Sequence, residues 1–144
     1  MKRSDKLGFL KGLAEKKKKD ADQLLMASRA RVEDAKAQLA QLQGFVAEYQ
    51  LRYEEAGRSG ASIAQINVYL GFINKLNGAI AQQEKALEMH QHELSVVEAH
   101  WAKSLGQSNA IAKRHQTSLN QEAAAEEKAL QRTFDERAGY PTRS

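Results

Sequence analysis

Residues 57–62, Gly-Arg-Ser-Gly-Ala-Ser, separate two long heptad patterns and decide how the chain folds. On each side of them, apolar residues recur at alternating spacings of three and four, which is typical of a helix that buries one narrow stripe against another helix. The glycines and serines favour a turn, and Ser62 with Gln65 three residues later forms the sequence pattern of a capping box. The chain is therefore predicted to fold back on itself here.

The heptad positions form two lines on each predicted helix. Before the turn the lines are Leu25, Val32, Leu39, Val46 and Tyr53, and Ser28, Ala35, Leu42, Tyr49 and Ala56. After the turn they are Ile66, Ile73, Ile80, Leu87, Leu94 and Trp101, and Tyr69, Leu76, Gln83, His90 and Val97. This pattern predicts an all-α fold, an elongated antiparallel two-helix coiled-coil hairpin. The expected register places Tyr49 near Leu70, Leu25 near Leu94 and Lys18 near Trp101.

We expect one coiled-coil domain over residues 1–144, with a first helix at about 6–57, a turn at 58–62, a longer second helix at about 63–138 and a tail at 139–144. Gly139 and Pro141 are the predicted stop signals of the second helix. Beyond about residue 112 its apolar line weakens, so this part is predicted to be an unpaired or transiently ordered helical extension.

The composition argues against an enzyme. The chain has no cysteine, which excludes disulfides and thiolate chemistry, and its 6% aromatic content and single proline disfavour a wide core. His90 and His92 point to different helix faces, and neither a catalytic dyad nor a phosphate-binding loop is recognisable. No apolar run approaches the roughly 18 residues of a membrane span. We expect a soluble, cytoplasmic protein without catalytic activity, metal or cofactor.

Positive charge is concentrated at the start of the chain. Residues 1–19 carry eight basic side chains and two acidic ones, and Lys16–Lys19 form an unbroken run. Such a run is most often a solvated helix end, although docking onto an acidic protein surface, a nucleic acid or a lipid remains open. The expected register brings Trp101 close to this run. Its expected role is packing in the core between the helices, and coverage of its ring by lysine stems is the alternative.

An apolar strip is predicted beside the helix pairing in the second helix, at Val68, Phe72, Leu76, Ala79 and Gln83. These residues are spaced three or four apart, and they make the apolar face of the second helix wider than a two-stranded coiled coil needs. Exposed apolar strips usually bind a partner. The alternative is that Phe72 folds over the edge of the pairing.

Three segments together resemble the flagellar FliJ protein family over nearly the whole chain. They are Leu13-Ala-Glu-Lys16, Leu39-Ala-Gln-Leu42 leading to Tyr49, and Tyr69-Leu-Gly-Phe-Ile-Asn-Lys-Leu76 after the turn. The resemblance implies a component of the flagellar type III export apparatus that is peripherally associated with the inner membrane. It also implies a stalk-like coiled coil that promotes assembly and activity of the export ATPase ring.

The resemblance further implies contacts with the membrane export gate and with export chaperones, and neither nucleic-acid binding nor membrane insertion. The gate contact is expected at Val68, Phe72, Leu76, Ala79 and Gln83. The ATPase-ring contact is expected at Leu10, Leu13, Lys16, Lys17, Lys18 and Trp101.

Two other functions fit the pattern of the residues. Residues 2–19 could make the chain a nucleic-acid-binding coiled coil, for which affinity would fall steeply with salt. Because heptads alone do not fix helix orientation, a self-associating structural protein or a parallel dimer is the other alternative.

Overall fold

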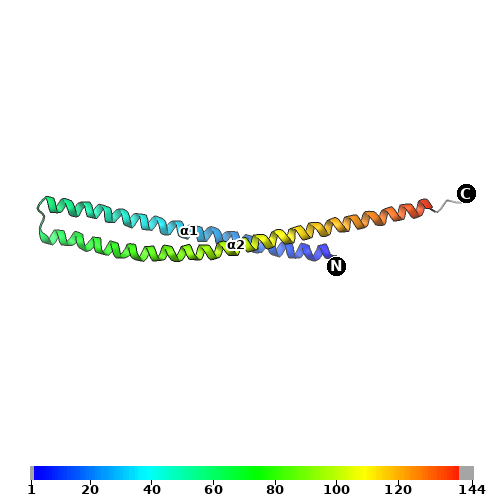
Figure 1. Ribbon diagram of the computed structural model, residues 1–144, viewed down its shortest axis with the longest axis horizontal. Coiled ribbons are helices and arrows are strands. Elements are labelled where there is room, and N and C mark those ends of the chain that lie inside the picture. Colours follow the sequence, from blue (N-terminus) through cyan, green and yellow to red (C-terminus); the bar gives the residue numbers. More distant parts are fainter. Residues whose placement is uncertain (1, 140–144) are drawn as a thin grey trace. The chain divides into compact units, whose positions relative to one another are not determined.

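The computed structural model describes residues 2–139, which form two helices joined by one short turn (Figure 1). Helix α1 spans Arg3–Arg58 and the longer helix α2 spans Ile63–Gly139. No strand occurs in this described range. The predicted all-α hairpin with a longer second helix is confirmed. Helix α1 begins at Arg3 rather than near residue 6, and positions 140–144 of the expected tail lie outside the described residues.

The chain divides into two compact units, which are described separately. The hairpin unit comprises residues 22–100 and contains the turn. The terminal unit combines residues 1–21 with residues 101–144. In both, the heptad positions that face the other helix are called the seam.

The turn is closed by backbone geometry that requires glycine. Gly60 has φ of 74°, the left-handed region, and the N–H of Ala61 donates to the carbonyl of Ala56 at 3.0 Å. This six-to-one bond ends α1 in a Schellman motif. On the other side, the N–H of Gln65 donates to Oγ of Ser62 at 3.3 Å, so Ser62 is the N-cap of α2 as predicted.

The hairpin unit is held by an apolar seam. Every predicted seam residue from Leu25 to Ala56 and from Ile66 to Val97 is buried or half-buried. Burying one leucine, isoleucine or valine side chain stabilises a fold by roughly 1.5–3 kcal/mol, so this seam is the main source of stability in the unit. The most deeply buried apolar residues here are Leu25, Val32, Ala35 and Ile73.

The terminal unit has a seam of a different composition. Its buried residues are small, and most are polar: Ser4, Ala14, Ala21, Ser104, Ser108 and Ser118. Such side chains bury little apolar surface, so each heptad contributes less hydrophobic stabilisation here. Gly8 fits the same pattern, because a Cβ on it would lie 3.3 Å from Nε2 of His115.

The expectation that α2 is unpaired beyond about residue 112 is wrong as far as Glu122. Ser118 is buried, and Glu122 contacts the start of α1. Small and polar seam residues do not produce a hydrophobic period, which is why the weakening apolar line was misleading. The side chains of the extension, residues 123–139, are all exposed.

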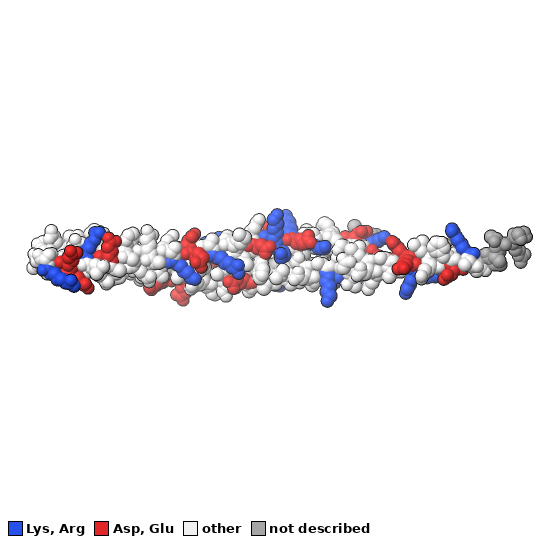
Figure 2. Space-filling view, turned by 90° about the horizontal axis from the view of Figure 1, so that it is seen from above, with Lys and Arg blue, Asp and Glu red and all other residues white. Residues whose placement is uncertain are grey.

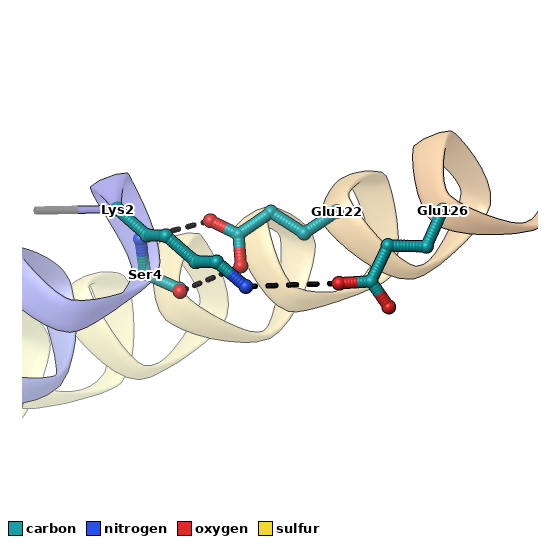
Figure 3. Close-up of polar contacts among 4 residues, drawn as sticks. All are labelled: Lys2, Ser4, Glu122 and Glu126. Carbon is teal, nitrogen blue, oxygen red and sulfur yellow. Dashed lines mark hydrogen bonds and ion pairs between the residues drawn. The ribbon is translucent and has the colours of Figure 1, made fainter. Parts of the chain in front are cut away.

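A polar clasp of Lys2, Ser4, Glu122 and Glu126 fixes the start of α1 (Figure 3). The N–H and Oγ of Ser4 both donate to the Glu122 carboxylate, at 3.2 and 2.6 Å, and Nζ of Lys2 lies 3.6 Å from Oε1 of Glu126. N–H groups in the first turn of a helix have no acceptor within that helix, and the preceding Lys2 offers no side-chain oxygen. Glu122 therefore caps α1 from the other helix.

Replacing Gly60 by alanine should destabilise the protein by about 1–2 kcal/mol, because an L-residue is strained in the left-handed region. The control is Gly44→Ala inside α1, where a Cβ meets nothing within 4 Å and the stability should rise by up to about 1 kcal/mol. Urea unfolding measures both free energies. Equal effects of the two substitutions would contradict the turn geometry.

The clasp should weaken in acid. Hydrogen bonds from Ser4 hold the pKa of Glu122 below its ordinary value of 4.5. The stability that the Glu122 carboxylate gives the folded state is therefore fully present above pH 4.5 and is lost as pH falls through the lower folded-state pKa. NMR titration of the Ser4 amide should give a midpoint below 4.5 that Glu122→Gln abolishes and Glu127→Gln does not. A midpoint at 4.5 or higher would show that Glu122 does not cap α1.

Candidate interaction surfaces

The apolar strip predicted in the second helix lies in the hairpin unit and is only partly exposed. Val68 and Phe72 leave 55% and 45% of their surface accessible, whereas Leu76, Ala79 and Gln83 are half-buried. Leu76 and Gln83 are seam residues. The accessible part of the strip is therefore its beginning, around Phe72.

Phe72 is held in place by an aromatic neighbour from α1. Its ring stacks on Tyr49 with centroids 5.4 Å apart and planes inclined by 22°, and Tyr49 also lies 6.4 Å from the ring of Tyr69. The guanidinium carbon of Arg52 is 5.6 Å from the Tyr49 centroid. These contacts fit the predicted register, and they order Phe72 while leaving nearly half of it accessible.

A shallow cavity of about 220 Å³ adjoins Phe72. Gly71 contributes only backbone to its wall, and a Cβ at this position would meet nothing within 4 Å. Lys75 contributes a positive charge to its lining. The cavity is lined by Asn67, Val68, Gly71, Phe72 and Lys75.

Gln83 has a role within the hairpin unit that its sequence position did not indicate. Its Nε2 donates to the backbone carbonyl of Ala35 at 3.1 Å, so the side-chain amide links the two helices.

The sequence pattern also did not predict a larger cavity of about 420 Å³ beside the turn, because both helices and the turn build it. Its lining is mixed in charge: Arg52, Glu55, Ala56, Ser59, Ala61, Gln65, Val68 and Tyr69.

The other predicted surface lies in the terminal unit, and the structure brings half of it together. Leu10, Leu13 and Lys17 line one cavity, with Leu10 and Leu13 46% and 45% exposed. Lys16 is exposed outside this cavity, whereas Lys18 and Trp101 are half-buried at seam positions. The lysine run is thus divided between the seam, the cavity and the outer surface.

Two adjoining cavities, of about 400 and 330 Å³, form what we call the terminal groove. They share Ala110 and Arg114. The larger is lined by Leu10, Leu13, Ala14, Lys17, Ser104, Gln107, Ala110, Ile111 and Arg114, and the smaller by Arg3, Ala110, Lys113, Arg114, Thr117, Ser118 and Gln121. One signal in the sequence could have pointed to it: residues 101–121 contain three basic side chains and no acidic one.

Basic and acidic side chains are interspersed with a larger neutral area on the face in Figure 2. Nδ1 of His90 lies 3.4 Å from Oε2 of Glu93. Within residues 2–139 no group of three histidine or acidic side chains is placed to hold a metal ion. In the same range, neither helix has a stretch apolar enough over a sufficient length to cross a membrane.

Comparison with known proteins identifies the family. The family model described as flagellar FliJ protein matches residues 2–143 of the 144-residue chain. No match was found among curated proteins or among solved structures. The match includes both helices, the surface around Phe72 and the terminal groove. The chain therefore belongs to the FliJ family and is a protein of the flagellar export system.

Proposed function

We propose that this protein is a non-enzymatic adaptor of flagellar type III export, which joins the ring of the export ATPase to the export gate and also contacts export chaperones. The observation that carries the proposal is the family match over residues 2–143, because it spans both candidate surfaces. On this proposal the protein is cytoplasmic and reaches the inner membrane only through the gate.

The terminal unit is the proposed ring contact. It exposes Leu10 and Leu13 next to Lys17, and its extension exposes Leu130 and Phe134 at 60% and 66%. Exposed apolar side chains of this size are favourable to bury against a partner. Lys16, Lys18 and Trp101 complete the proposed ring-binding region. Contacts with several ATPase subunits at once would promote ring assembly and hydrolysis.

The surface around Phe72 is the proposed gate contact, with Val68, Leu76, Ala79 and Gln83 as its other members. Phe72 is already ordered by Tyr49, so binding would cost little additional side-chain entropy. An apolar gate side chain could enter the shallow cavity beside Gly71. Gln83 would contribute indirectly, by fixing α2 against Ala35.

The ring contact is tested by ATP hydrolysis of the purified cognate export ATPase at low concentration. The wild-type chain should stimulate hydrolysis, and Leu10→Asp combined with Leu13→Asp should raise the concentration needed by at least about tenfold, as for loss of an interface hot spot. Leu51→Asp is the control, since Leu51 is 68% exposed in the hairpin unit. Absence of stimulation by a folded wild-type chain would reject the ring contact.

The gate contact is tested by calorimetry with the cytoplasmic part of the gate protein. Phe72→Asp should weaken binding by at least about tenfold, because a partly buried aromatic anchor is replaced by a charge. The matched control is Leu70→Asp, two residues away on the same helix and 38% exposed. Unchanged affinity of the Phe72 variant, or an equal loss in both variants, would refute a specific site at Phe72.

A further inference from the structure

All charged side chains that line the terminal groove are positive. Four of its lining side chains are basic, namely Arg3, Lys17, Lys113 and Arg114, and no carboxylate lines either cavity. Arg114 belongs to both cavities. Cations that line a groove favour a partner that carries negative charge at the matching positions.

The wall of the larger cavity combines apolar side chains with the two cations Lys17 and Arg114. Leu10 and Leu13 from α1 face Ala110 and Ile111 from α2 across a space of about 400 Å³. Nearly half of each leucine is accessible although both lie within the groove. An occupant that only neutralised the cations would leave this apolar surface in water, so the groove fits a partner with apolar side chains as well.

The terminal groove is long enough to hold several turns of a partner helix. Its lining on α2 runs from Ser104 to Gln121, which at a rise of about 1.5 Å per residue is roughly 26 Å. This corresponds to four to five helical turns. An amphipathic helix laid in such a groove places side chains three and four residues apart along its floor.

We propose that the terminal groove binds an acidic amphipathic helix of a partner protein. Its apolar residues face Leu13 and Ala110, and aspartate or glutamate residues on either side of them pair with Lys17, Lys113 and Arg114. The inference deepens the proposed ring contact and rests on it for the protein that carries the helix. Nucleic acid fits less well, because phosphates bound to the cations would cover the leucines without contacting them favourably.

The direct test uses two synthetic helical probes and the full chain. The acidic probe has leucines spaced three and four apart with glutamates beside them, and the neutral probe has glutamine at each glutamate. Fluorescence anisotropy at low salt should show at least tenfold tighter binding of the acidic probe. Equal affinity of the two probes would overturn the proposal.

Two substitutions with the same charge change locate the binding site. Arg114→Glu should weaken the acidic probe at least tenfold, whereas Lys19→Glu, at an exposed position that does not line the groove, should weaken it less than threefold. Leu13→Gln should weaken both probes. Equal losses in the two charge variants, or tighter binding of a DNA duplex with the same sensitivity to Arg114, would contradict a helix-binding groove. Circular dichroism confirms that each variant remains helical.

ATPase stimulation separates this inference from the proposed function. If the wild type and Arg114→Glu stimulate the ATPase equally, the groove proposal is wrong and the ring contact remains. If the wild type does not stimulate, the ring contact is wrong, and the preference for the acidic probe still decides what the groove binds.

Discussion

All helix pairing in this protein depends on one heptad register. In α1 it runs from Ser4 to Ala56 and in α2 from Ile66 to Glu122, and every seam position in these ranges is buried or half-buried. Composition changes along the register while the register itself does not. The hairpin unit fills the seam mainly with leucine, isoleucine and valine. In the terminal unit the fully buried seam residues are all serine or alanine, and the bonds between Glu122 and Ser4 end the seam. Stability should follow this change in composition.

The two units differ in how firmly their seams order the candidate surfaces that they carry. Around Phe72, stacking on Tyr49 and the apolar seam beneath give a well-ordered patch. The terminal unit instead combines a weaker seam, a groove lined with cations and an extension whose side chains have no cover within the described chain. Under the proposed function, a firm hairpin unit would present one surface to the gate, while the terminal unit would gain most of its order from the ATPase ring.

The sequence predicted those parts of the structure that are set by the heptad repeat of apolar residues and by its interruption at the turn. The turn, the cap at Ser62 and the seam from Leu25 to Val97 belong to this class. The pairing of α2 between residue 112 and Glu122 was missed because Ser118 and Glu122 occupy heptad positions without being hydrophobic. The terminal groove and the bond from Gln83 to Ala35 depend on the register between the two helices, which no single helix pattern reveals.

Amide hydrogen exchange, followed residue by residue, tests the central claim that the seam composition sets local stability. Residues 8–20 and 42–54 of α1 lie at similar distances from the two ends of the helix, so simple fraying affects them alike. The account predicts that amides of residues 8–20 exchange at least about tenfold faster than those of residues 42–54, since their seam buries less apolar surface. Equal protection of the two segments, or stronger protection of residues 8–20, would contradict it.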